Sequence, residues 1–341
     1  MKRIYFHIGY PKTGTTFFQK YLFGNKFFNL GKPYATFNRK KYNQIVNDIL
    51  DGIFNLDENA FENNKKKFVE KINQLVEFNN TNKPNIISLE AFTNPQNSFK
   101  TNISRIKRLI ILFNQSSVEL KICFFIRNQY DILSSSFLWS ILYLYNLDAK
   151  LINYKYFIKS IINQNLKIQN YIDCLNYYAF YDEVLNHIKK ENLKIFVFEK
   201  IISENNFYYD FFNFFNIKIE QKEIDEIKKK IINYNSNKPS WVLNIFIWKN
   251  YSNISYLLKN LIKLNFSNDV IKSNIKNQLK IFRKVKTLYI FLRIIFLSKI
   301  NDDFKIDCGS DEINKIKKIF YKSNYDLDKK CNLNLEKYNY F

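Results

Sequence analysis

The chain has 341 residues, 46% of them apolar, and it contains 34 Phe and 24 Tyr. This length and composition suit a folded protein with one large α/β core or two small ones, and they exclude a disordered chain. The formal charge is +22, but 46 Lys stand beside only 7 Arg. Because bidentate binding of phosphates and bases favours arginine, we do not expect a nucleic-acid binder.

The first predicted element is a buried strand at residues 3–8, which is rich in β-branched and aromatic side chains. It leads into G-Y-P-K-T-G-T-T at residues 9–16 and then into an amphipathic helical stretch at residues 17–23. A strand, a glycine-bearing turn and a helix N-terminus bind anions, because backbone N–H groups and the helix dipole face the same point. In nucleoside-triphosphate loops the lysine follows the second glycine, whereas Lys12 here precedes Gly14.

Further along the chain, apolar runs predict three more strands, at residues 85–89, 120–126 and 193–198. Helical patterns separate or follow them, at residues 61–78, 103–113, 130–145 and 171–190. This alternation predicts an α/β fold with a P-loop-like, three-layer αβα arrangement and a mostly parallel central sheet. The first three strands run into the Lys12 loop, Glu90 and Arg127. Those residues should share the carboxyl edge of the sheet, where open α/β sheets bind ligands.

The third of these runs forms a second motif. K-I-C-F-F-I-R ends at Arg127, and a predicted helix begins soon afterwards. Ser135 lies eight residues beyond Arg127, a separation of about two helical turns. Ser134 and Ser136 flank Ser135, so the serine that belongs to this motif could also be either of these neighbours.

Together the two motifs resemble those of sulfotransferases that use 3′-phosphoadenosine 5′-phosphosulfate (PAPS). P-K-T-G-T-T is similar to their 5′-phosphosulfate loop, and Arg127 with Ser135 is similar to their 3′-phosphate motif. The resemblance implies PAPS as co-substrate, adenosine 3′,5′-bisphosphate as product and no metal. It implies that Lys12 is catalytic and contacts the phosphosulfate. The residues it assigns to donor binding are Lys12, Thr13, Gly14, Thr15, Thr16, Arg127 and Ser135.

The resemblance also implies a base near the end of the second predicted strand. Some branches of the family use a glutamate there and the cytosolic small-molecule branch uses a histidine, but no histidine lies between His7 and His187. Glu90 is therefore the candidate catalytic base. The alternative is a carboxylate that only complements the dipole at the start of a helix.

We expect residues 1–341 to form a single domain. Residues 201–234 look helical, and the turn-rich N-Y-N-S-N-K-P at residues 233–239 predicts a break. Residues 240–300 then form a helical excursion, a candidate acceptor-side lid. Its most apolar window, residues 288–297, fits either a buried cap helix or a basic-flanked helix at an anionic membrane surface.

Near the C-terminus a charged helix from Asp311 is expected to precede S-N-Y-D-L at residues 323–327, followed by an aromatic tail. The S-N-x-x-L element resembles bacterial family members that modify carbohydrates. Asn235 and Ser236 are weaker candidates for completing the 3′-phosphate site.

Cysteine usage and the absence of leader-like segments predict the compartment. The four cysteines form no C-x-x-C pair and lie near no histidine, so we expect no zinc site. The first strand begins by residue 4, and no apolar stretch reaches about 18 residues. We expect a bacterial cytoplasmic enzyme, with peripheral contact at the inner face of the membrane as a further option.

The sequence thus favours transfer of a sulfuryl group from PAPS to a hydroxyl or amine acceptor, on resemblance a bacterial surface carbohydrate or glycolipid. One alternative is an ATP-dependent small-molecule or sugar kinase, which requires a different lysine position. Another is a basic membrane- or nucleic-acid-associated binding protein. The acceptor, the position modified on it and the oligomeric state stay open.

Overall fold

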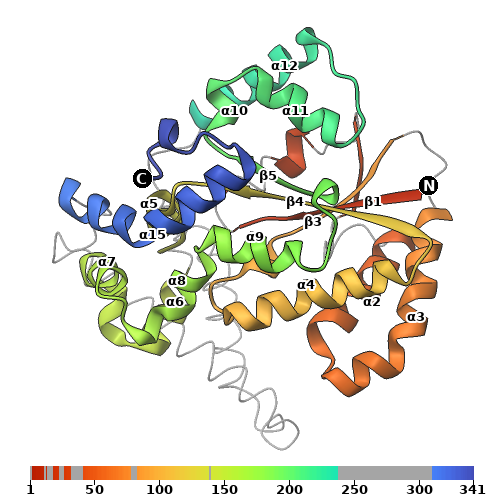
Figure 1. The fold of residues 1–341 in the computed structure, drawn as a ribbon, viewed down its shortest axis with the longest axis horizontal. Helices are drawn as coiled ribbons and strands as arrows, with labels where there is room; N and C mark the ends of the chain where they lie inside the picture. Colours follow the sequence, from red (N-terminus) through yellow and green to blue (C-terminus); the bar gives the residue numbers. More distant parts are fainter. Residues whose placement is uncertain are drawn as a thin grey trace, which may run out of the picture.

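The fold is described from a computed structural model that covers residues 2–10, 13, 18–22, 27–31, 41–77, 83–137, 140–236 and 309–341. Within these residues a sheet of five parallel strands runs through the molecule in the order β2-β3-β1-β4-β5 (Figure 1). The strands are β1 (Lys2–Ile8), β2 (Asn29–Gly31), β3 (Asn85–Leu89), β4 (Val118–Ile126) and β5 (Leu193–Val197).

Helices cover both faces of the sheet. The α-helices before β5 are α2 (Lys41–Asn55), α3 (Glu58–Glu77), α4 (Phe99–Asn114), α5 (Gln129–Phe137), α6 (Ile141–Leu147), α7 (Tyr154–Ile162), α8 (Gln169–Cys174) and α9 (Tyr177–Leu185). Those after β5 are α10 (Lys200–Ser203), α11 (Asn206–Phe214), α12 (Gln221–Ser236) and α15 (Ser310–Cys331). Short helical segments are η1 (Phe18–Leu22), η2 (Glu90–Thr93), η3 (Ala149–Ile152), η4 (Leu166–Ile168), η5 (Lys190–Asn192) and η7 (Glu336–Tyr338).

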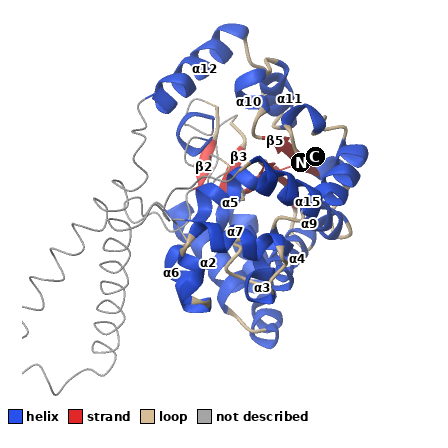
Figure 2. Ribbon diagram, turned by 90° about the vertical axis from the view of Figure 1, so that its left-hand side faces the viewer, coloured by secondary structure: helices blue, strands red, loops and turns tan. Residues whose placement is uncertain are grey.

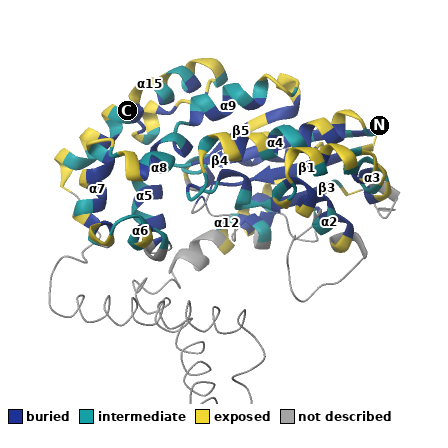
Figure 3. Ribbon diagram, turned by 90° about the horizontal axis from the view of Figure 1, so that it is seen from below, coloured by how far each residue is buried: buried dark blue, intermediate teal, exposed yellow. Residues whose placement is uncertain are grey.

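The side-chain alternation of the central strands produces two cores. On β1, Phe6 packs toward the layer that contains α4 and α9, whereas Tyr5 packs toward the layer that contains α11 and α12. On β4, Phe124 and Phe125 divide between the two layers in the same way. Strands buried on both faces read as continuous apolar runs, which is why the sequence predicted them. Figure 2 shows the two helical layers with the sheet between them, and Figure 3 shows the strands as the buried centre.

The predicted three-layer α/β fold with a parallel sheet is therefore confirmed. Its start is P-loop-like, since the central strand β1 leads through a turn to the helical segment η1. From β1 the chain builds β2 and β3 on one side and then crosses to β4 and β5 on the other. This reversal is a topological switch point at the carboxyl ends of β1 and β4, the place where open α/β sheets bind ligands.

Some predicted boundaries were wrong. The pattern at residues 171–190 predicted one helix, but the structure has α8 and α9, because the Asn176 side chain accepts a hydrogen bond from the N–H of Ala179 and caps a new helix. The pattern at residues 130–145 likewise covers two helices, α5 and α6. The break expected from residue 233 begins later, since α12 continues through Ser236.

The C-terminal prediction also needs correction. S-N-Y-D-L does not follow the charged helix but lies within it, because α15 extends to Cys331. The predicted excursion at residues 240–300 lies outside the described residues. Among the helices that the structure describes, none is both long and apolar enough to cross a membrane.

Candidate active site

The turn after β1 carries the first motif, of which the structure describes Gly9, Tyr10 and Thr13. The Tyr10 carbonyl accepts hydrogen bonds from the Thr13 hydroxyl (2.7 Å) and from the Thr13 N–H (3.3 Å). Tyr10 is buried against Phe124 and other aromatic rings below the turn. Thr13 is also buried, and its two hydrogen bonds to the Tyr10 carbonyl close the turn. Its assigned role in phosphate binding stays a prediction.

The other residues of this motif, Lys12, Gly14, Thr15 and Thr16, lie outside the described residues. Their assignment to the phosphosulfate therefore rests on the sequence, together with the position of the turn at the carboxyl end of the central strand.

Glu90 lies at the neighbouring strand end. Ile8 of β1 pairs with Leu89 of β3, so Glu90 comes level with Gly9, the first residue of the turn. Glu90 opens the short helix η2 and is partly buried. Thr93, at the end of η2, donates a hydrogen bond from its hydroxyl to the Gly9 carbonyl (2.6 Å). This contact fixes the segment that carries Glu90 against the turn after β1.

Arg127 lies on the opposite side of β1, directly after β4. Its guanidinium carbon sits 5.1 Å from the centre of the Phe198 ring, and its Nε lies 3.8 Å from an Asp131 carboxylate oxygen. The Arg127 carbonyl accepts a hydrogen bond of 2.6 Å from the Tyr177 hydroxyl. Both ends of this residue are therefore held, the side chain by an aromatic face and an ion pair, the backbone by a buried tyrosine.

Ser135 and Arg127 lie along one face of the segment that begins at the end of β4. Asp131 connects them, since its carboxylate contacts Arg127 and its carbonyl accepts the Ser135 hydroxyl hydrogen at 2.6 Å. The neighbouring serines are used elsewhere: Ser134 contacts the Tyr154 hydroxyl at 2.6 Å, and Ser136 is buried. To donate to a phosphate, the Ser135 hydroxyl must rotate away from the Asp131 carbonyl.

The three strand ends thus stand in the order β3 with Glu90, β1 with the turn that follows it, and β4 with Arg127. β3 and β4 both pair with β1, and neighbouring strands lie about 4.8 Å apart. A small ligand centred on the turn after β1 has Glu90 on one side and Arg127 on the other.

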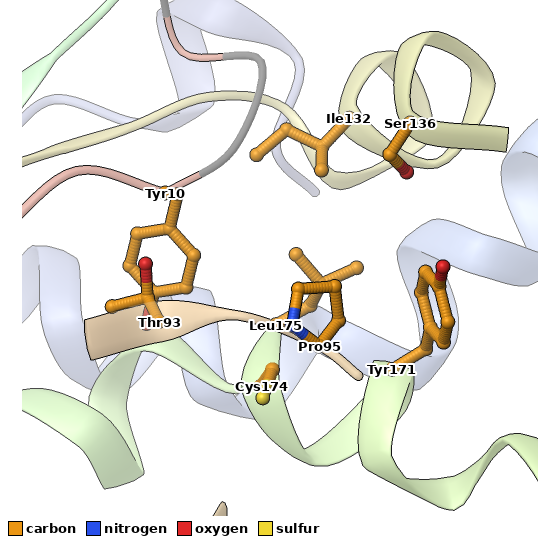
Figure 4. Close-up of a pocket in the computed structure, with 8 residues that line it drawn as sticks. All are labelled: Tyr10, Thr93, Pro95, Ile132, Ser136, Tyr171, Cys174 and Leu175. Atoms are coloured by element: carbon orange, nitrogen blue, oxygen red, sulfur yellow. The ribbon is translucent and has the colours of Figure 1, made fainter. Parts of the chain in front are cut away.

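A narrow apolar cavity adjoins this edge of the sheet (Figure 4). Ser136 of α5 and Tyr171 of α8 face each other across it, and Tyr10 closes one end. The full lining is Tyr10, Thr93, Pro95, Ile132, Ser136, Tyr171, Cys174 and Leu175. The cavity encloses about 10 Å³, space for about one water molecule, so it is far too small to hold an acceptor.

His7, Cys123 and Cys174 are buried residues of the core. His7 is fully buried, its Nδ1 lies 2.8 Å from the Ser88 hydroxyl, and burial lowers its pKa to about 3. The imidazole is therefore neutral at pH 7, as expected for a core histidine. Burial raises the pKa of both buried thiols, Cys123 and Cys174. In the part of the chain that the structure describes, no three His, Cys, Asp or Glu residues come together in a way that could hold a metal ion.

The S-N-Y-D-L element has a structural role. Asn324 is fully buried and exchanges two side-chain hydrogen bonds with Gln129 of α5, at 2.7 and 3.1 Å. Its amide nitrogen also donates to the Tyr340 carbonyl (2.9 Å). Leu327 lies in the core, and the Ser323 hydroxyl accepts from the Tyr178 N–H (3.2 Å). This element thus fastens α15 to the start of the helix behind Arg127.

Comparisons with known proteins give fold neighbours only. No protein-family model matches the chain, and no curated protein matches it. Among solved structures it is similar to a sulfotransferase from Alicyclobacillus acidocaldarius (15% identity, 67% of this chain and 90% of that chain, TM-score 0.37). It is also similar to the sulfotransferase domain from the curacin biosynthetic pathway (12%, 66% and 77%, TM-score 0.38) and to mouse sulfotransferase SULT7A1 complexed with PAP (15%, 67% and 63%, TM-score 0.35). Since these TM-scores are below 0.5, the fold class stated above rests on the strand order and register of this chain.

Proposed function

We propose that this chain is a sulfotransferase that transfers the sulfuryl group of PAPS to a hydroxyl acceptor. The observation that carries the proposal is the position of the two sequence motifs on neighbouring strands. The phosphosulfate-like loop follows β1 and the 3′-phosphate-like arginine follows β4, with both at the carboxyl edge of the sheet and at its switch point.

Two features support PAPS as the donor at this edge of the sheet: the positive charge of the two motifs and their position on neighbouring strands. PAPS carries phosphate at both its 5′ and 3′ positions, and the chain presents a lysine-bearing turn at one strand end and an arginine at the next. The planar guanidinium of Arg127 suits a phosphate because its donors match the oxygens in a fixed fork. PAPS supplies the sulfuryl group, and the chain supplies positioning and charge stabilisation.

In this proposal each group has one task. Lys12 stabilises the negative charge that develops on the phosphate as it leaves. Arg127 and Ser135 bind the 3′-phosphate and so distinguish this donor from ATP. Glu90 accepts the proton of the attacking hydroxyl, and its place on the far side of the turn from Arg127 brings the acceptor in from the β3 side of the sheet.

A thermal-shift comparison tests the donor class. A ligand that binds the native state raises its stability, by about 2.7 kcal/mol when present at 100 times its Kd. We expect adenosine 3′,5′-bisphosphate to raise the melting temperature and ADP with Mg²⁺ to have little effect. A preference for ADP with Mg²⁺ would instead support a kinase. No shift with either nucleotide, together with salt-sensitive binding to vesicles or nucleic acid, would support a basic binding protein.

For the acceptor we propose a glycan or glycolipid, on the family resemblance of the S-N-x-x-L element. Incubation of the protein with ³⁵S-labelled PAPS and cell-envelope extract tests this. Label in a saccharide or glycolipid fraction is expected. Label only in small phenols or alcohols added as competing acceptors would contradict the acceptor class while leaving sulfuryl transfer intact.

A further inference from the structure

Glu199 lies two residues beyond β5 and next to the strand end that carries Arg127. Ile126 pairs with Val197, and the pairing continues as the Phe198 N–H donates to the Ile126 carbonyl (2.9 Å). One carboxylate oxygen of Glu199 accepts a hydrogen bond from the N–H of Asn128 (2.9 Å). Because Asn128 directly follows Arg127, Glu199 holds the backbone from which the guanidinium projects.

The second carboxylate oxygen of Glu199 is also occupied. It accepts a hydrogen bond from the hydroxyl of Tyr340 (2.9 Å), a residue that is 1% exposed. The residue before it, Asn339, accepts through its carbonyl from the Asn128 side chain (2.7 Å). Asn324 of α15 in turn holds the Tyr340 carbonyl. The segment at residues 339–340 is thus bonded to the same strand end as Glu199.

Both polar atoms of the peptide bond between Arg127 and Asn128 are bonded to side chains. The Tyr177 hydroxyl donates to the carbonyl (2.6 Å), and Glu199 accepts from the N–H (2.9 Å). A peptide at the end of a strand has no further ladder partner, so such contacts decide how it is oriented. Burial raises the pKa of the Glu199 carboxyl, because its charged form loses solvation.

We propose that Glu199, Tyr177 and Tyr340 are positioning residues that fix the Arg127 peptide, and that they set the preference of the site for a 3′-phosphorylated adenosine nucleotide. The proposal rests on the proposed function. None of the three needs to touch the nucleotide. Their effect passes through the arginine, since a guanidinium that is turned away by a loosened peptide loses its bidentate geometry.

The test compares two nucleotides on the full chain by titration calorimetry. For Tyr340→Phe and Tyr177→Phe we expect the Kd for adenosine 3′,5′-bisphosphate to rise about tenfold, the equivalent of one hydrogen bond. The Kd for AMP, which lacks the 3′-phosphate, should change less than twofold. Glu199→Gln keeps one acceptor oxygen and should show the same selective loss.

Tyr338→Phe is the matched control, because Tyr338 lies two residues before Tyr340 and its hydroxyl contacts Glu204 instead. It should leave both Kd values unchanged. The positioning role is overturned if the variants weaken both nucleotides equally, as a general loss of structure does, or weaken neither. A wild-type chain that binds AMP as tightly as the bisphosphate would overturn the proposed function itself.

Discussion

Glu90 is the residue whose role is most directly testable. It lies level with the turn after β1, on a segment that Thr93 fastens to that turn. If it accepts the acceptor proton, Glu90→Gln should lower kcat about 10²- to 10⁴-fold, because the amide keeps the size and loses the basicity. Steady-state kinetics with ³⁵S-labelled donor measures this, and the Kd for adenosine 3′,5′-bisphosphate should remain close to that of the wild type.

Glu191→Gln is the control for this change. Glu191 is exposed and lies in η5, before β5, at the amino edge of the sheet. It should leave kcat unchanged. A Glu90→Gln variant with full kcat would assign Glu90 to the dipole of η2 and leave the base to another residue.

His7 yields a prediction about acid stability. Burial lowers its pKa to about 3 in the folded chain, while an unfolded histidine has a pKa near 6.5. Below pH 6.5 the unfolded chain therefore binds a proton that the folded chain does not, and stability falls as the pH falls. Between pH 6.5 and 4.5 this loss amounts to about 2 kcal/mol.

Urea denaturation of the wild type and of His7→Gln at both pH values measures it. Because the comparison uses the difference between two pH values, the cost of the substitution itself cancels. The loss on acidification should be about 2 kcal/mol smaller in the variant. Equal losses would mean that the imidazole is protonated within the fold.

Sequence reasoning reached some of the site residues and missed others for a physical reason. Arg127 and Ser135 were predicted as a pair because together they resemble the 3′-phosphate motif of PAPS-dependent sulfotransferases, a motif that can be found in a short stretch of sequence. Thr93 and Glu199 were missed, since they act on partners 84 and 71 residues away in the chain. No local pattern marks a hydroxyl or a carboxylate that will meet a distant backbone group.

At the scale of elements, the longer strands of the sheet were predictable from the sequence, but the edge strand β2 was not. The run at residues 85–89 coincides with β3, and the run at residues 120–126 lies within β4, because both strands are buried on two faces. β2 is only three residues long, too short for any periodicity to appear. Its assignment depends on pairing with β3, a relation set by tertiary structure.

The link between α15 and α5 provides the prediction at this scale. Asn324→Ala removes both hydrogen bonds to the buried amide of Gln129 and the one to the Tyr340 carbonyl. Leaving buried polar groups without partners costs about 1–3 kcal/mol. The free energy of unfolding should therefore fall by that amount in the variant, and the midpoint of urea denaturation should fall with it. Asn314→Ala, on the exposed face of the same helix, should cost nothing measurable. If the two variants are equally stable, the link does not contribute to holding α15 in place.

For the whole molecule, the formal charge of +22 bears on how ligands approach the protein. A strongly cationic protein attracts anionic ligands and speeds their association. The sequence predicted the class of fold because strands and helices alternate. It could not predict which groups gather at one edge, since that depends on the strand order β2-β3-β1-β4-β5. That order places β1, with the first motif, between the strands that carry Glu90 and Arg127.

This arrangement predicts where a nucleotide protects the chain. In hydrogen exchange with saturating adenosine 3′,5′-bisphosphate, peptides that carry Lys12, Glu90 and Arg127 should exchange more slowly, because they share the carboxyl edge of the sheet. Peptides at the opposite edge, around Ser117 and Glu191, should exchange as in the free protein. If AMP slows exchange at the carboxyl edge as much as adenosine 3′,5′-bisphosphate does, the 3′-phosphate makes no contact there. Protection centred on the amino edge would place the nucleotide away from both motifs, and the two strand ends could then not form one donor site.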